Sequence, residues 1–398
     1  MDNQILSGIR VLELGQLIAG PFAAKTLADF GAEVIKVEPP GEGDPLRKWR
    51  MLNDGTSVWW QAQSRNKQSV CIDLRQPEGQ ALVRQLAASA DVLIENFRPG
   101  TMEKWGMGWE ELHALNPRLI MLRVSGYGQD GPKRDEPGFA AIAEAMGGIR
   151  YITGEPGRVP VRAGVSLGDT IAGLHGALGV LLALYQRDAR GGVGQMIDVA
   201  LYEAVFNLTE SLLPEYSVFG AIRQPAGGSL PGIAPSNAYR CADGEYVLIA
   251  GNGDSIFKRL MELIGRRDLA DDPDLARNNG RAARVQEIDA AIEAWTGTLG
   301  IDVALGKLTA ASVPSGRIYT ARDIAEDPHY RARGVIETVR CADGLAVEVP
   351  GIVPKLSGNP GAIHSRGPAL GEHTEAALAG AGVASEQIAA LKAKGVVS

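Results

Sequence analysis

Short apolar runs recur along the first third of the chain, and longer amphipathic segments separate them. Helical patterns lie at residues 21–30 and 80–88, and Gly31 closes the first of them. Strands that alternate with helices indicate βαβ units, whose right-handed crossovers place helices on both faces of a parallel sheet. Four runs have the length and aliphatic content of buried strands: residues 9–14, 33–37, 91–94 and 119–124.

The middle of the chain continues this pattern and then changes. Residues 171–187 predict one long buried helix, followed by a strand at residues 195–199 and a helix at residues 201–213. A Gly/Pro-rich stretch at residues 224–232 is typical of a loop or linker. A hairpin pattern at residues 239–249 then turns at Asp243-Gly244 and opens a second unit.

These patterns predict an α/β fold with a mainly parallel sheet and helices on both of its faces, as in a doubly wound domain, and a second unit after the loop at residues 224–232. We place the N-terminal part of the large domain at residues 1–223 and the small domain, with its linkers, at residues 224–320. Residues 321–398 form a C-terminal segment with a short strand and a helix.

Composition and charge exclude several functional classes. The chain has a formal net charge of −7 and a sequence pI near 5.4, whereas a nucleic-acid-binding surface needs a basic stripe. Cys71, Cys241 and Cys341 lie far apart and form no CxxC pair, which disfavours disulfides and zinc. The five histidines form no ligand cluster. We therefore expect no nucleic-acid partner and no metal.

The N-terminal and apolar segments favour a cytoplasmic protein without a membrane partner. Residues 1–10 contain no basic region followed by an apolar stretch, so no signal peptide is expected. The longest apolar stretch, residues 171–185, is shorter than a bilayer requires. The few cysteines fit a reducing compartment.

Two short motifs suggest other enzyme classes. Residues 126–131 match G-x-G-x-x-G after an apolar strand, but the segment that follows contains Pro132 and Pro137 and cannot supply the required helix. This excludes a nicotinamide cofactor. Residues 164–168 match G-x-S-x-G, the nucleophile elbow of α/β-hydrolases, although Pro160 interrupts the expected preceding strand. A serine esterase that uses Ser166 is therefore kept as an alternative.

Asp169 stands at the start of the long apolar helix. An aspartate at this place is an effective N-cap. The same place also suits chemistry, because the helix macrodipole stabilises an anionic carboxylate and a carboxylate can attack an activated acyl group. Gly168 and Gly173 are small neighbours that would let a substrate approach. The local pattern leaves both interpretations open.

Several segments, in order along the chain, resemble the class III CoA-transferase family, which includes formyl-CoA transferase and carnitine CoA-transferase. The similarity runs from Leu6 to the C-terminus, and the order of the landmarks makes it specific although each is weak alone. The landmarks are Ala19-Gly20-Pro21, residues 28–38, residues 65–69, residues 95–100, Gly168-Asp169 and Gly371-Glu372-His373-Thr374.

The resemblance implies that Asp169 is the catalytic nucleophile. In the family, the matching carboxylate attacks an acyl-CoA thioester to give a mixed anhydride, and CoA thiolate then converts it to an aspartyl-CoA thioester. An acceptor carboxylic acid takes the CoA through a second anhydride. Coenzyme A is thus a substrate, no cofactor is bound permanently, and water must be kept from the intermediates.

The resemblance also implies a set of CoA contacts. Arg75 is a candidate phosphate partner, and Lys104 keeps the charge but not the fork of an arginine in formyl-CoA transferase. Pro39 and Pro137 stand where that enzyme has basic residues. Each basic residue here could equally be a solvated surface charge. The implied contacts are Ile18, Ala19, Ile72, Asp73, Leu74, Arg75, Asn96, Phe97, Arg98, Lys104 and Phe139.

Two departures from formyl-CoA transferase bear on the substrate. Ile18 replaces an active-site glutamine, and the tetraglycine loop is reduced to Gly227-Gly228-Ser229, which we expect to be the substrate loop. Formyl-CoA and oxalate are therefore disfavoured as substrates, and a dicarboxylate such as succinate is preferred.

The resemblance includes a rival, α-methylacyl-CoA racemase, and an inactive CoA-binding homologue is a further alternative. The racemase adds a histidine for proton exchange, but Pro137-Gly138-Phe139-Ala140 supplies no ionisable group here. The aspartate at position 169 argues against an inactive protein. The resemblance finally implies a large doubly wound domain built from both chain ends, a smaller α+β domain between them, and an interlocked homodimer.

Overall fold

The computed structural model describes residues 4–398, and the chain divides into two compact units. Unit 1 comprises the described residues up to Arg150 together with Ala163–Val218 and His329–Ser398. Unit 2 comprises Tyr151–Arg162 and Phe219–Pro328. Both ends of the chain therefore contribute to unit 1. The expected limits of the small domain, residues 224 and 320, fall inside unit 2.

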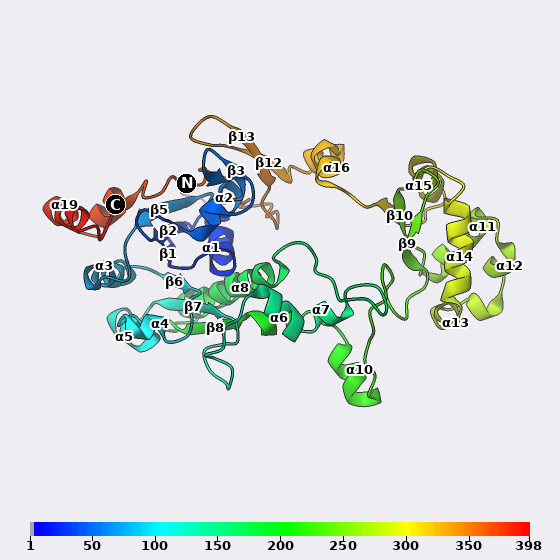
Figure 1. Cartoon of the computed structure of the whole chain (residues 1–398), viewed down its shortest axis with the longest axis horizontal. Coiled ribbons are helices and arrows are strands. Elements are labelled where there is room, and N and C mark those ends of the chain that lie inside the picture. Colours follow the sequence, from blue (N-terminus) through cyan, green and yellow to red (C-terminus); the bar gives the residue numbers. More distant parts are fainter. Residues whose placement is uncertain (1–3) are drawn as a thin grey trace. The chain divides into compact units, whose positions relative to one another are not determined.

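Unit 1 is organised around a six-stranded sheet in the order β5-β2-β1-β6-β7-β8, in which every neighbouring pair is parallel (Figure 1). The predicted doubly wound parallel sheet is confirmed, and five of its strands coincide with predicted runs. The strands are β1 (Arg10–Glu13), β2 (Glu33–Glu38), β5 (Lys67–Cys71), β6 (Val92–Glu95), β7 (Ile120–Ser125) and β8 (Met196–Ala200).

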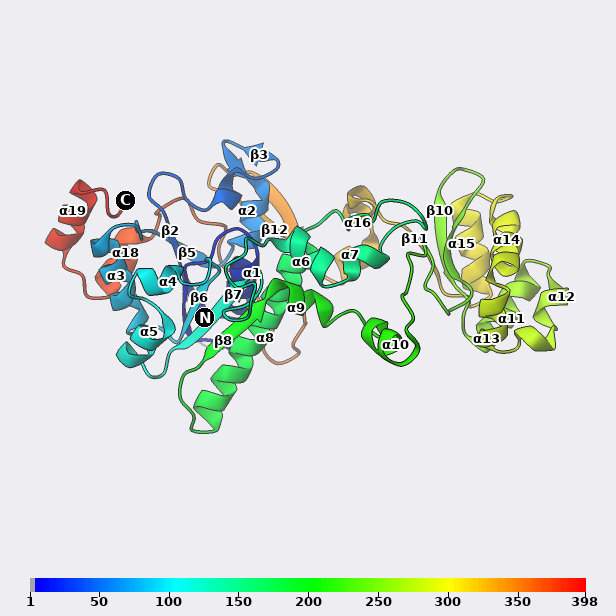
Figure 2. The same cartoon turned by 60° about the horizontal axis from the view of Figure 1, so that its bottom comes forward.

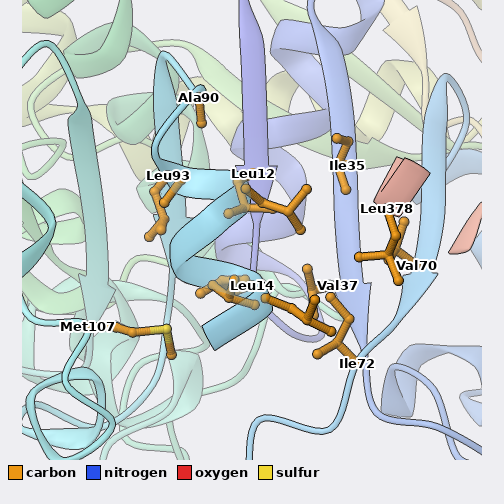
Figure 3. Packing of buried hydrophobic residues seen from close by; sticks show 14 of the residues in the cluster. Leu12, Leu14, Ile35, Val37, Val70, Ile72, Ala90, Leu93, Met107 and Leu378 are labelled. Carbon is orange, nitrogen blue, oxygen red and sulfur yellow. The ribbon is translucent and has the colours of Figure 1, made fainter. Parts of the chain in front are cut away.

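The alternation of side chains along the strands gives unit 1 two cores, one on each face of the sheet. Leu12, Ile35 and Leu93 point to one core, which Figure 3 shows in close-up together with Leu378. Val11 and Val34, their neighbours in sequence, point to the other core. The first face is covered by α3 (Pro77–Ala87), α4 (Thr101–Lys104), α5 (Trp109–Leu115), α18 (Thr374–Gly380) and α19 (Ser385–Ala393). The second is covered by α1 (Ala19–Asp29), α6 (Ala140–Met146), α8 (Leu167–Ala189) and α9 (Leu201–Phe206).

The long helix α8 is longer and less buried than the sequence predicts. It has 23 residues, and among residues 4–398 it is the one helix that length and composition would allow to cross a membrane. Half of its most apolar window is buried, by packing on α1 and the sheet. The argument that this segment is too short for a bilayer is therefore wrong, and one face of the helix packs into the core of unit 1. Its other face leaves Leu178, Leu182 and Tyr185 more than half exposed.

Shorter elements complete unit 1. Two small antiparallel pairs lie outside the main sheet. The elements are η1 (Pro45–Lys48), β3 (Leu52–Asn53), β4 (Thr56–Ser57), α2 (Val58–Gln63), α7 (Ile149–Ile152, which continues into unit 2), α10 (Leu212–Phe219), α17 (Pro328–Ala332), β12 (Ile336–Arg340) and β13 (Ala346–Pro350).

Unit 2 contains an antiparallel three-stranded sheet and helices that pack around its own core (Figure 2). The predicted hairpin is present as β9 and β10, joined by the turn at Asp243-Gly244. The elements are β9 (Ser236–Arg240), β10 (Tyr246–Ala250), β11 (Ser315–Arg317), α11 (Asp254–Leu263), α12 (Arg267–Ala270), η2 (Pro273–Leu275), α13 (Asn278–Ala283), α14 (Val285–Thr296), α15 (Ile301–Ala310) and α16 (Ala321–Glu326).

Candidate active site

The strand order of unit 1 reverses between β1 and β6. From β1 the chain moves outward through β2 to β5, and from β6 it moves outward in the other direction through β7 to β8. In open α/β sheets, ligands bind outside the carboxyl ends of the strands at such a switch point. The segments that leave the two central strands here are residues 15–18 and residues 96–98.

The first turn of α8 lies close to the carboxyl ends of these two central strands. A Cβ atom on Gly173 would lie 2.8 Å from the carbonyl oxygen of Ala19, the first residue of α1. Asp169 is four residues earlier on the same helix, and residues four apart share a helix face. Gly168, beside it, packs against the carbonyl of Ala140 at the start of α6. Glycines on both sides thus allow two helices to approach the turn that carries Asp169.

Asp169 is not the N-cap of α8. Ser166 occupies the cap position without a side-chain cap hydrogen bond, and Asp169 is the third residue of the helix. It is half-buried and is the acidic residue of the first turn. The interpretation of Asp169 as a cap is therefore wrong. The macrodipole argument still holds, because a carboxylate in the first turn is close to the positive end of the helix dipole.

A second carboxylate lies next to this turn. Glu144 of α6 is buried, and its Oε1 accepts a hydrogen bond from the amide of Gly168 at 3.3 Å. Its Oε2 lies 3.7 Å from Nη1 of Arg150. Glu144 could not be selected from the sequence, since its position in a short Ala-rich segment is typical of an exposed helix.

The candidate CoA contacts gather after the carboxyl ends of three strands of unit 1. Ile18 and Ala19 follow β1, residues 72–75 follow β5, and residues 96–98 follow β6. Lys104 ends α4, and Phe139 precedes α6 with 72% of its surface exposed. Parallel strands bring these segments to one edge of the sheet.

Several of these side chains already have partners in unit 1. Arg75 donates to both carboxylate oxygens of Asp73, at 2.8 and 3.1 Å. These hydrogen bonds lower the pKa of Asp73 to about 2. The guanidinium is 79% exposed as a side chain, so it remains accessible to a phosphate. Phe97 packs edge-on against Trp105, with ring centroids 5.2 Å apart.

The candidate substrate loop belongs to unit 2. The amide of Gly227 donates to the carbonyl of Gly154 at 3.0 Å, and Ser229 Oγ donates to the carbonyl of Ala226 at 2.9 Å. Gly227 has a φ of +63°, which glycine adopts without strain. The loop is thus a defined turn.

A group of buried charged side chains in unit 1 was not predicted from the sequence. Lys36 Nζ contacts Glu13 and Asp44, each at 2.8 Å, and Lys67 Nζ contacts Glu13 at 2.7 Å. Burial alone would lower the pKa of Lys36, but the surrounding carboxylates raise it above its usual value. Burial lowers the pKa of Lys67 to about 8, since Glu13 only partly offsets the lost hydration.

The two competing motifs lack the geometry that they require. No strand directly precedes Gly164, because residues 159–166 are irregular, so a nucleophile elbow is absent around Ser166. The glycine-rich stretch after β7 leads into turns, and the next helix begins only at Ala140. Neither Ser166 nor residues 126–131 therefore forms the site that its motif suggested.

Comparison with known families identifies the enzyme class. Residues 6–374 match the family described as CoA-transferase family III.

The chain belongs to CoA-transferase family III.

The enzyme is 50% identical over 394 residues to the succinyl-CoA–D-citramalate CoA-transferase of Chloroflexus aurantiacus, and the alignment covers 98% of each chain. It is 43% identical to the β subunit of succinyl-CoA–L-malate CoA-transferase from the same organism, again over 98% of each chain. Among solved structures, a CaiB/BaiF family protein from Brucella suis matches with a TM-score of 0.84 and 36% identity, covering 95% of this chain and 100% of that one. The fold and the enzyme class expected from the sequence are confirmed.

Proposed function

We propose that this CoA-transferase moves coenzyme A from succinyl-CoA to a short 2-hydroxydicarboxylic acid of the citramalate or malate type, with Asp169 as nucleophile. The observation that carries the proposal is the position of Asp169, in the first turn of α8 at the ligand-binding edge of the sheet. The donor and acceptor class are supported by the two relatives whose names contain succinyl-CoA and a hydroxydicarboxylate.

The reaction requires no redox partner and no net proton transfer. A carboxylate oxygen of Asp169 attacks the thioester carbon of succinyl-CoA, the C–S bond breaks, and CoA leaves as thiolate. The thiolate attacks the aspartyl carbon of the anhydride and releases succinate. The acceptor carboxylate attacks the aspartyl-CoA thioester and releases the thiolate, which then attacks the acceptor's acyl carbon and regenerates Asp169. Two easier exchanges thus replace one direct transfer.

Unit 1 supplies the CoA-binding edge in this proposal. Arg75 and Lys104 contribute positive charge for the phosphates, and the segments after β5 and β6 contact the nucleotide. The turn at residues 227–229 serves as the substrate loop. The enzyme acts in the cytoplasm, in keeping with its three free cysteines.

We also propose that the enzyme works as a homodimer. Leu174, Leu178, Leu182 and Tyr185 follow one another at helical spacing on α8, and each is at least half exposed. Contiguous exposed apolar surface is typical of association sites. Light scattering of the purified enzyme tests the dimer: twice the chain mass supports it and the mass of a single chain contradicts it.

The proposed activity is tested by exchange assays with matched variants. Succinyl-CoA is incubated with D-citramalate, L-malate, acetate or oxalate, and the new CoA ester is measured by mass spectrometry. We expect transfer to the hydroxydicarboxylates, loss of transfer in Asp169→Asn, and retention in Ser166→Ala. Activity that survives Asp169→Asn but not Ser166→Ala would replace the aspartate mechanism with the serine alternative.

A further inference from the structure

The loop that leaves β1, residues 15–18, is held by side chains from four other segments of unit 1. Each of its four residues has a backbone polar group bonded to a side chain. Loops usually satisfy such groups with water or with their own backbone. A loop held at every residue is fixed in one conformation, and this loop lies at the switch point of the sheet.

Asn96 makes the most complete of these contacts. Its Oδ1 accepts from the amide of Gln16 and its Nδ2 donates to the carbonyl of Gln16, both at 2.8 Å. The carboxamide therefore pairs with both backbone groups of one residue, as a neighbouring strand would. Asn96 follows β6, so this pair joins the two central strands beyond their carboxyl ends.

Three other buried side chains hold the loop residues on either side of Gln16. Lys36 Nζ donates to the carbonyl of Gly15 at 2.8 Å, and Asp44 accepts from the amide of Leu17 at 3.1 Å. Gln63 of α2 donates to the carbonyl of Ile18 at 3.0 Å. Lys36, Asp44 and Gln63 are all buried. Their hydrogen bonds are shielded from competing water, which makes them costly to break.

The loop conformation is strained, which indicates that these contacts determine it. Leu17 has a φ of +62°, a region that costs a residue with a side chain about 1–2 kcal/mol. Such strain persists only where the surroundings over-determine the backbone, and it clusters at functional sites. The next residue, Ile18, is the N-cap of α1. The carbonyl of Ala19, the first residue of that helix, lies against Gly173 on α8.

We propose that Asn96, with Lys36, Asp44 and Gln63, is a positioning residue of CoA transfer. These side chains fix residues 15–18 and with them the start of α1. The carbonyl of Ala19 packs against Gly173 of α8, and this contact holds Asp169 in position for attack on the thioester. The inference rests on Asp169 being the nucleophile. It gives Asn96 a role different from the CoA contact implied by resemblance, since its carboxamide pairs with the protein backbone.

The two roles of Asn96 predict different kinetics. A lost CoA contact weakens the binding of CoA, whereas a misplaced nucleophile slows the chemical step and leaves binding unchanged. Asn96→Asp keeps the size of the side chain and the acceptor for the Gln16 amide, but sets an oxygen against the Gln16 carbonyl. We expect kcat to fall about 100-fold, as for a misplacement of about 1 Å, while the Kd for free CoA, measured by calorimetry, is unchanged.

Asn116 offers a matched control. It is also half-buried, and its Nδ2 donates to the carbonyls of Ala87 and Ala90 at 3.1 and 2.9 Å. It precedes β7 and so lies at the amino ends of the strands, whereas Asn96 lies beyond their carboxyl ends. Asn116→Asp is expected to destabilise the fold comparably but to leave kcat unchanged. Equal losses of kcat in both variants would show a general effect of stability and overturn the inference.

A second variant guards against misfolding of the first. In Gln63→Met the Ile18 carbonyl keeps its helical bond from the amide of Phe22 at 2.7 Å, so the fold has little reason to fail. A smaller fall in kcat, again without a change in the Kd for CoA, supports the inference. A weaker affinity for CoA with unchanged kcat, in either variant, contradicts it.

Trapping separates failure of this inference from failure of the proposed function. Hydroxylamine converts an aspartyl anhydride or thioester to a hydroxamate on the Asp169 peptide. If the unaltered enzyme gives no hydroxamate, the proposed nucleophile is wrong. If it does, and Asn96→Asp forms the hydroxamate as fast as the unaltered enzyme, the nucleophile stands and the positioning role is wrong.

Discussion

Gly173 on α8 faces the carbonyl oxygen of Ala19 on α1 so closely that a Cβ atom there would lie 2.8 Å from it. The same Cβ would lie 3.0 Å from Cβ of Phe22. Because backbone atoms cannot move aside as a side chain can, Gly173→Ala should push the two helices apart. We expect a loss of about 1–3 kcal/mol in the free energy of unfolding, measured by urea denaturation, and a fall in kcat.

The control for this prediction is Gly306→Ala on α15, where no atom lies within 4 Å of the new Cβ position. Alanine favours the helix there, so stability should be unchanged or slightly higher. Equal behaviour of the two variants would show that the Ala19–Gly173 approach is not tight.

Glu144 provides a second test of how the first turn of α8 is held. In Glu144→Ala the Gly168 amide loses its acceptor, and we expect a cost of about 1 kcal/mol together with slower transfer. Glu144→Gln keeps an oxygen acceptor and should stay close to the unaltered enzyme in both properties. Steady-state kinetics and denaturation check this. A defect in the glutamine variant as large as that in the alanine variant would mean that the negative charge matters more than the hydrogen bond.

Asp44 gives the enzyme a defined sensitivity to acid. Burial alone would raise the pKa of Asp44, but Lys36 and the amides of Leu46 and Leu17 hold it below its usual value of 3.8. A carboxyl group with a lowered pKa stabilises the folded state above its unfolded-state pKa, and this contribution is lost as pH falls through the folded-state value. Stability from Asp44 is therefore complete above 3.8 and disappears below it.

We expect the unaltered enzyme to lose more unfolding free energy than Asp44→Asn between about pH 5 and the acid range below 3.8. Denaturation curves collected across this range measure the difference. Parallel loss of stability in the two proteins would show that Asp44 is not ionised in the fold.

The absence of an ionisable group at residues 137–140 predicts transfer without racemisation. Phe139 is the N-cap of α6, and Ala140, the first residue of that helix, lies next to Gly168. An acyl-CoA with an α-methyl group, incubated with the enzyme in deuterated water, should gain no deuterium at its α-carbon. Enzyme-dependent incorporation, detected by mass spectrometry, would reveal a base in the site and favour the racemase alternative.

The strands of unit 1 were predictable where burial on both faces leaves continuous apolar residues, as in β6 and β7. β5 was missed because Lys67 and Ser69 interrupt its apolar pattern, yet both are buried and paired with Glu13 and Glu38. A charged residue inside a strand indicates surface unless its partner is known, and the partner comes from another strand. Propensity and periodicity carry no such information.

The candidate site shows the same limit. The sequence placed Asp169 at a helix start, and the family landmarks suggested the nucleophilic role that we propose for it. The pairing of Asn96 with Gln16, 80 positions away in the chain, could not be read from either residue, since it depends on β1 and β6 being neighbours. Similarly, a helix pattern could not show that one apolar face of α8 is left exposed, because periodicity locates apolar residues and not what covers them.

The measurement that tests the central claim most directly is the mass of the Asp169 peptide after the enzyme has been mixed with succinyl-CoA and hydroxylamine without an acceptor acid. The account predicts a hydroxamate on Asp169, absent when succinyl-CoA is omitted and absent from Asp169→Asn. An unmodified Asp169 peptide in an enzyme that transfers CoA in the same preparation would contradict it.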